Sequence, residues 1–141
     1  EFGLQAIRVP HEPFLISWQS THEDIGRRLA NDFFLQPFVW SQRKKIRLAK
    51  MTCNDYIFGL NDTGGMNRKR MLEFLANLPE GVSEIYCHPA TESRDTMNKD
   101  SKCCSATNEF SALTDPSVKA AFSQFSIVRT TYGALSKHES G

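Results

Sequence analysis

The stretch that decides the fold class of this chain is residues 51–90, MTCNDYIFGLNDTGGMNRKRMLEFLANLPEGVSEIYCHPA. Residues 51–58 are typical of a strand, and a turn-forming run follows them. Residues 67–78 carry apolar side chains at helical spacing, and Pro79 and Gly81 supply the stop. Residues 82–87 predict the next strand, so this stretch indicates a strand, a helix and a second strand in succession.

The segment before this stretch continues the alternation. Residues 4–9 predict a short strand closed by Pro10, because proline cannot donate to a sheet ladder. From about residue 21 to residue 50, apolar residues approximate helical spacing. Pro37 interrupts that pattern and would kink or end a helix, so two helices or one bent helix both fit.

The segment after it predicts two further elements. Residues 91–108 are polar and charged, as is typical of a loop. A helix is expected to begin near residue 108 and to lead directly into a fourth strand at 126–132. Strands that alternate with helices predict an α/β fold with parallel strands, either a barrel or a doubly wound sheet. If it is a barrel, four strands are about half of the eight that close it, so core surface would be exposed and a partner needed.

Composition excludes several classes of protein. The 141 residues, 40% hydrophobic and 23% charged, are ordinary for one soluble globular domain. With 17 basic and 16 acidic side chains, net charge favours neither nucleic acid nor an anionic membrane as a partner. The longest uncharged apolar stretch, 33–40, is too short to span a bilayer. The N-terminus shows neither an initiator methionine nor a signal peptide, so residues upstream of Glu1 are expected.

The four cysteines indicate a reducing compartment. Cys53 and Cys87 lie in apolar runs and are expected to be small core residues. Cys103 and Cys104 lie in the polar stretch, and no C-x-x-C pair occurs. We therefore expect reduced thiols and a cytoplasmic protein.

His88 is the leading catalytic candidate. It follows the strand at 82–87, and Pro89 forces it into an extended conformation. The carboxyl end of a parallel strand is where active sites lie in α/β folds. A histidine there can act as a general acid or base, while an ordinary loop histidine is the alternative interpretation.

Four other residues are candidates for substrate binding. Arg8 and Glu12 stand at the end of the first strand, where a guanidinium can orient a substrate group. A structural ion pair between them, bracing the proline-rich loop, is the alternative. Asn54 and Asp55 lie on the second strand or at its exit, where substrate contact and turn capping are both open.

No metal site is expected within this chain. Its histidines show no spacing that is typical of metal ligands, such as H-x-H or H-E-x-x-H. The apolar patch formed by Phe33, Phe34, Phe38 and Trp40 precedes a basic run at 43–45. Such a patch fits docking on a membrane surface or on a lipid-linked substrate, or else burial against the rest of a barrel.

Two segments, Cys53 to Leu60 and Gly81 to Ala90, closely resemble the YdjC-like carbohydrate deacetylases, especially the branch associated with hopanoid biosynthesis. Residues 8–13 and 109–113 fit the same branch, and the Cys-His-Pro-Ala sequence is the most specific feature. The resemblance implies residues 1–141 are a single partial domain, the C-terminal half of a TIM-like (β/α) barrel. It implies hydrolysis of the acetamide of an N-acetylated amino sugar, or of a glycolipid that carries one.

The resemblance also implies roles for particular residues. His88 corresponds to the active-site histidine that protonates the leaving amine or steadies the tetrahedral intermediate. Arg8 would face the same pocket. The family's Asp-Asp motif and its metal-ligand histidines have no counterpart here. The ligands of the divalent metal, Mg or Zn, are therefore expected upstream, and the isolated chain is expected to be inactive.

Two alternatives differ in class from this enzyme. One is a non-catalytic module that acts through self-association, such as a homodimer, or through partner binding. The other is a sugar isomerase-like barrel, which would transfer a proton rather than hydrolyse an amide.

Overall fold

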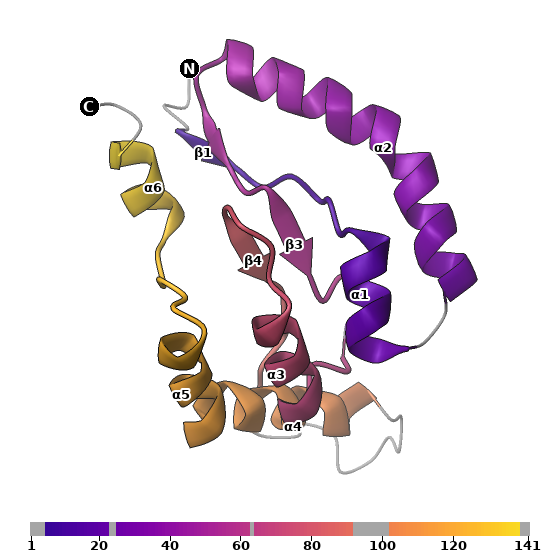
Figure 1. Ribbon diagram of the computed structural model, residues 1–141, viewed down its shortest axis with the longest axis vertical. Coiled ribbons are helices and arrows are strands. Elements are labelled where there is room, and N and C mark those ends of the chain that lie inside the picture. Colours follow the sequence, from indigo (N-terminus) through magenta and orange to yellow (C-terminus); the bar gives the residue numbers. More distant parts are fainter. Residues whose placement is uncertain (1–4, 23–24, 63, 92–101, 139–141) are drawn as a thin grey trace.

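The computed structural model describes residues 5–22, 25–62, 64–91 and 102–138. Short strands and longer helices alternate along the chain (Figure 1). The strands are β1 (Ala6–Ile7), β2 (Thr52–Cys53), β3 (Tyr56–Phe58) and β4 (Ser83–Ile85). The helices are α1 (Phe14–Thr21), α2 (Ile25–Leu48), α3 (Arg68–Ala76), α4 (Lys102–Thr114), α5 (Pro116–Gln124) and α6 (Tyr132–His138).

The strands pair in parallel, which confirms the predicted α/β class. β1 pairs with β2 and β3 pairs with β4. The strand predicted at 51–58 is thus present as two short strands, interrupted at Asn54 and Asp55. The buried amide of Asn54 takes the place of ladder bonds at the interruption, since it binds both the N–H and the C=O of Val9. Three parallel segments therefore lie side by side, those near residues 5–11, 52–58 and 82–86.

The helix predicted at 67–78 is confirmed as α3. The side chain of Asn67 caps it by accepting a hydrogen bond from the Arg70 N–H at 3.1 Å. Met71, Phe74 and Leu75 pack into the main core against Phe58. This core also takes Val118 and Ala121 from α5, so α3 and α5 cover the same face of β3 and β4.

The region before β2 holds one helix that the sequence did not predict and one that it did. α1 begins directly after Pro13, which serves as its N-cap residue in extended conformation. α2 continues through Pro37 without ending, so the single-helix alternative is the correct one. Proline has no backbone N–H, so one carbonyl in the preceding turn of α2 lacks its helical hydrogen bond. Because Pro37 is exposed, this carbonyl faces solvent rather than the core.

The region after β4 departs from the prediction at two points. α4 already includes Lys102, so Cys103 and Cys104 lie in a helix and not in the expected loop. The single helix expected from residue 108 is divided into α4 and α5. Asp115 caps α5 through the Ser117 N–H, and Pro116 occupies its first turn.

The fourth strand expected at 126–132 is absent. Ser126 adopts a positive φ of 55°, and the Ile127 N–H donates to the Phe122 carbonyl at 2.7 Å. The chain thereby turns at the end of α5 rather than entering the sheet. Residues 127–131 run past β4 without pairing with it, and α6 begins at Tyr132.

Alternation along the strands separates two faces of the sheet. Val9 packs against Val39 and Ile46 of α2, and Ile85 packs against the main core. Their neighbours Arg8 and Glu84 must then point to the opposite face, because successive side chains of a strand alternate. The helices α2, α3 and α5 thus share one face of the sheet, and we call the opposite one the open face.

Candidate functional site

His88 lies just beyond the carboxyl end of β4, as the sequence predicted. Its backbone N–H donates to the Glu109 Oε2 at 2.5 Å. Glu109 is fully buried in α4, and its Oε1 accepts from the Met66 N–H at 3.3 Å. One carboxylate therefore ties the loop after β4 to the loop after β3. The exposed ring of His88 meets Tyr86 edge to face, with 4.7 Å between ring centroids.

Arg8 reaches the same tyrosine from the first strand. Its guanidinium carbon lies 5.3 Å from the centroid of the Tyr86 ring. The Arg8 Nε also donates to the Glu84 Oε2 at 2.9 Å, and the Tyr132 hydroxyl donates to the same oxygen at 2.6 Å. The alternative interpretation, an ion pair between Arg8 and Glu12, is wrong, because Arg8 pairs with Glu84. We call Arg8, Glu84, Tyr86, His88 and Tyr132 the open-face cluster.

The electrostatics of the open-face cluster centre on Glu84. Burial raises the pKa of Tyr132 well above its ordinary value, and the hydrogen bond to the Glu84 carboxylate adds to the shift. The same carboxylate raises the pKa of Arg8 by hydrogen bonding, against the opposing effect of burial. The cluster therefore presents a fixed cation and a neutral phenol beside His88.

Tyr132 is expected to keep its proton where ordinary tyrosines ionise, near pH 10. In an alkaline titration followed by near-ultraviolet phenolate absorbance, the wild type and Tyr132→Phe should give equal signals at about pH 11. Glu84→Gln should let Tyr132 ionise closer to its ordinary pKa, because the anionic acceptor is gone. A smaller signal in Tyr132→Phe than in the wild type at that pH would contradict the described geometry.

Glu12 lies in a different environment from Arg8 and is buried. It accepts hydrogen bonds from the Ser17 hydroxyl at 2.7 Å and from the Asn61 N–H at 2.9 Å. Arg28 lies 3.8 Å from it and binds Asp62 through two hydrogen bonds of 2.7 and 3.0 Å. Burial raises the pKa of Glu12, and the Asp62 carboxylate adds to the shift. We call Glu12, Ser17, Arg28, Asp62 and Arg70 the buried polar network.

This network stabilises the loops beyond the first two strands. The side chains of Arg28 and Asp62 are 1% and 2% exposed, which leaves little surface for a substrate. Arg70 adds a second cation, 3.3 Å from Asp62. The hydrogen bonds of Glu12 brace the surrounding loops, but Glu12 also lines a cavity of about 210 Å³ with His11 and Asn61, so its substrate binding stays a prediction.

Asn54 and Asp55 also lie away from the open-face cluster. Asn54 is fully buried, and its amide donates to the carbonyls of Val9 and Tyr56, both at 2.9 Å. Asp55 precedes β3, and its Oδ2 accepts from the Val82 N–H at 2.8 Å. It therefore binds the start of β4, at the amino ends of the strands and not at the carboxyl edge. The described contacts of Asn54 are to backbone groups of the sheet, whereas Asp55 also pairs with Arg43 at 3.8 Å and lines a cavity of about 300 Å³.

Several residues of the site escaped the sequence analysis. Glu84 and Tyr86 precede His88 at two-residue steps, so strand alternation alone would have placed all three on one face. Glu109 stands three residues before the buried Ala112, and a charged residue on the apolar stripe of a helix is a recognisable signal. Nothing in the local sequence indicated Tyr132, because it comes from a segment that was expected to be a strand.

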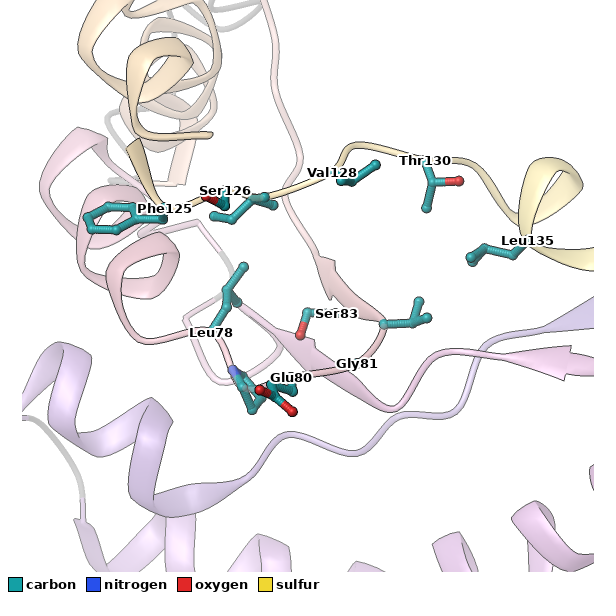
Figure 2. A pocket seen from close by; sticks show the side chains of 12 residues that line it. Leu78, Glu80, Gly81, Ser83, Phe125, Ser126, Val128, Thr130 and Leu135 are labelled. Carbon is teal, nitrogen blue, oxygen red and sulfur yellow. The ribbon is translucent and has the colours of Figure 1, made fainter. Parts of the chain in front are cut away.

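A groove of about 540 Å³ lies on the edge of β4 and is distinct from the open-face cluster (Figure 2). One wall is formed by residues 78–83 and the other by residues 125–130 with Leu135. Figure 2 shows Ser83 on the wall that includes β4, and its buried hydroxyl oxygen has no hydrogen-bond partner among the described residues. The groove occupies the place where the expected fourth strand would have paired.

In residues 5–22, 25–62, 64–91 and 102–138, no three His, Cys, Asp or Glu side chains lie together so as to hold a metal ion. In the same part of the chain, no helix has both the length and the apolar character needed to cross a bilayer.

Comparison with known proteins gives one match. A family model with the description YdjC-like protein matches residues 1–124. No curated protein and no solved structure matches the chain. The matched range includes β1 to β4 and every residue of the open-face cluster except Tyr132.

Proposed function

The chain belongs to the YdjC-like protein family, and we propose that it forms part of a metal-dependent carbohydrate N-deacetylase. The proposed reaction is hydrolysis of the acetamide of an N-acetylated amino sugar. The observation that carries the proposal is the placement of Arg8 and His88 around the same Tyr86 ring. The two residues come from the first and last of the three parallel segments, so only the folded sheet brings them together.

The layering of the fold supports a place within a barrel. α2, α3 and α5 cover one face of the parallel strands, as the outer helices of a (β/α) barrel do. A doubly wound sheet carries helices on both faces, and here α6 contacts β1 and β2 and brings Tyr132 to the open face, so the proposal of a barrel rests on the three helices of the covered face. We propose that residues 1–141 are a single partial domain, the C-terminal half of a TIM-like barrel. The open face would then be the lining of the barrel.

Amide hydrolysis requires a proton for the departing nitrogen. Water adds to the carbonyl carbon, the C–N bond breaks, and the amine leaves only once its nitrogen has taken up a proton. The His88 imidazolium, exposed at the carboxyl end of β4, is the proposed donor of that proton. Arg8 is half exposed and would bind a sugar hydroxyl while Glu84 holds its guanidinium in place.

The metal of the proposed reaction does not fit the residues of the chain that the structure describes. No group of ligands is present among the described residues, so we propose that Mg or Zn is held by residues outside residues 1–141. When bound, such an ion polarises the amide carbonyl and activates water. The proposed role of this chain is limited to sugar binding and proton donation.

The finer proposal concerns the substrate and the location. A hopanoid-linked N-acetylglucosamine is the proposed substrate, on the resemblance of residues 53–60 and 81–90 to the hopanoid-associated branch. Cys53 and Cys87 are not part of a disulfide and are partly buried in apolar surroundings, which supports the proposed cytoplasmic location.

A second candidate function is a non-catalytic module that self-associates or binds a partner. The observation that favours it is α2, where Phe33, Phe34, Phe38 and Trp40 are each 70–79% exposed. Large apolar patches on a surface mark interaction sites. A homodimer that forms through this face, in a protein without deacetylase activity, would favour this candidate.

Metal titration of the 141-residue chain tests whether His88 acts as an acid or as a metal ligand. Calorimetry with Zn and with Mg is expected to show no binding that depends on His88, since His88 is proposed to act as an acid and not as a ligand. The matched titration uses His88→Ala. Stoichiometric binding in the wild type that disappears in His88→Ala would contradict the proposed role and would make this chain a metalloprotein in its own right.

A further inference from the structure

α2 presents a large apolar surface away from the rest of the chain. The helix runs along the margin of the molecule, with one side toward α1 and the sheet (Figure 1). Val39 and Ile46 on that side are buried against Val9. We call six of the exposed apolar residues of α2 the α2 outer face. They are Leu29, Phe33, Phe34, Phe38, Trp40 and Leu48, which are 48%, 74%, 70%, 71%, 79% and 76% exposed.

The outer face continues into a basic region. Lys44, Lys45 and Arg47 are exposed in the last part of α2. A groove of about 620 Å³ lies beside them, bounded by Trp40, Lys44, Arg47 and Leu48 and floored by Val39. Arg43 also lines this groove but pairs with Asp55, so an indole ring and two further cations, Lys44 and Arg47, surround the groove. A ligand that combines an anionic group with apolar chains matches this arrangement.

The charge of α2 argues against pairing with a second copy. Asp32 is the one acidic residue in the sequence of α2, and it is engaged by Gln36 at 2.7 Å. A copy of the same helix would therefore offer no free anion to Lys44, Lys45 and Arg47. Anionic headgroups at a bilayer surface supply that charge, and the acyl boundary beneath them accepts aromatic side chains.

We propose that the α2 outer face docks on the surface of bilayers that contain anionic lipids. The helix would lie in the plane of the interface, with Phe33, Phe34 and Phe38 in the acyl boundary and Trp40 at headgroup level. Lys44 and Lys45 would contact the phosphates. This inference does not depend on the proposed deacetylase activity, because it uses no residue of the open-face cluster.

Vesicle co-sedimentation of the 141-residue chain tests the proposal. The wild type should bind vesicles that contain phosphatidylserine at least tenfold more tightly than vesicles of phosphatidylcholine alone, and added salt should weaken this binding. Phe34→Ser/Trp40→Ser and Lys44→Glu/Lys45→Glu should each reduce binding by about tenfold or more. All four side chains are exposed, so far-ultraviolet circular dichroism should be unchanged.

Matched controls change equally exposed residues elsewhere. Lys69→Glu/Lys119→Glu reverses two exposed cations on α3 and α5, and Val128→Ser removes a side chain that is 86% exposed. Both should bind as the wild type does. Equal binding to neutral and anionic vesicles would overturn the proposal, as would variants of α2 that bind normally. A stable dimer that Trp40→Ser dissociates would also overturn it and would assign the outer face to a second copy.

Discussion

His88→Ala is expected to lower the rate of acetate release by about 100- to 10,000-fold, the range that a positioned general acid contributes. The assay uses a protein in which this chain follows the Asp-Asp and histidine motifs that the family resemblance places upstream. His88 is exposed at the carboxyl end of β4, and its edge-to-face contact with Tyr86 orients the ring. Without the imidazole, the amine nitrogen must take its proton from water.

Three variants separate proton donation from other effects of the substitution. His88→Gln keeps a hydrogen-bond donor but cannot transfer a proton, so it should be about as slow as His88→Ala. His22→Asn removes an exposed imidazole at the end of α1 and should leave the rate unchanged. Arg8→Lys should mainly raise KM, because it keeps the charge and loses the fixed geometry. Full activity in His88→Gln would exclude His88 as the acid.

Arg28→Met is expected to lower the free energy of unfolding by about 3–5 kcal/mol. Arg28 is 1% exposed and donates two hydrogen bonds to Asp62, with Glu12 3.8 Å away. Its loss leaves two buried carboxylates, and the cation near Asp62 among the described residues is then Arg70, which is more exposed. For a chain of this size, such a loss is a large part of the total stability. Urea unfolding followed by the fluorescence of Trp18, a residue of α1, measures the change.

Arg68→Met is the matched control for this substitution. Arg68 lies 3.3 Å from Asp115, but its side chain is 61% exposed. Exposed ion pairs contribute about 0–1 kcal/mol, so this variant should unfold close to the wild type. Adding Asp62→Asn to Arg28→Met should restore part of the loss, since one unpaired charge is removed. If Arg28→Met and Arg68→Met lowered the free energy of unfolding equally, the buried polar network would contribute no more to stability than an exposed ion pair does.

Local sequence patterns correctly predicted the helices and strands whose caps, stops and apolar spacing lie within their own residues. The helix at 67–78 carries its own cap at Asn67, and its apolar stripe became the main core. The parallel strands near residues 52–58 and 82–86 followed from the helix between them. The position of His88 at the carboxyl end of a strand followed from the same unit, because Pro89 marks the end of that strand.

Contacts distant in sequence decided the elements that local patterns missed. The split at Asn54 exists because its amide binds Val9, which is 45 residues away. The segment 126–132 has strand-like composition, but the chain turns at Ser126, and Tyr132 binds Glu84 of β4 through its side chain instead of forming ladder bonds. No spacing rule indicates these partners.

In the candidate site, too, some features could be predicted from local sequence and others depend on distant contacts. Arg8 and His88 were expected at one pocket, and the structure places both against Tyr86. Glu12, Asn54 and Asp55 were selected for their position near strand ends, yet their hydrogen-bond partners are structural. A polar residue near a strand end can serve catalysis or brace the backbone, and burial distinguishes the two only after folding.

The most direct test of the central claim is acetate release from an N-acetylated amino sugar. The protein that joins this chain to the family's upstream motifs would be incubated with N-acetylglucosamine oligomers and with Mg or Zn, and free acetate and free amine would be measured together. We predict equal amounts of both products, no release by residues 1–141 alone, and strong loss in His88→Ala. A joined protein that binds the metal ion, folds normally and releases no acetate from any amino sugar would contradict the deacetylase assignment.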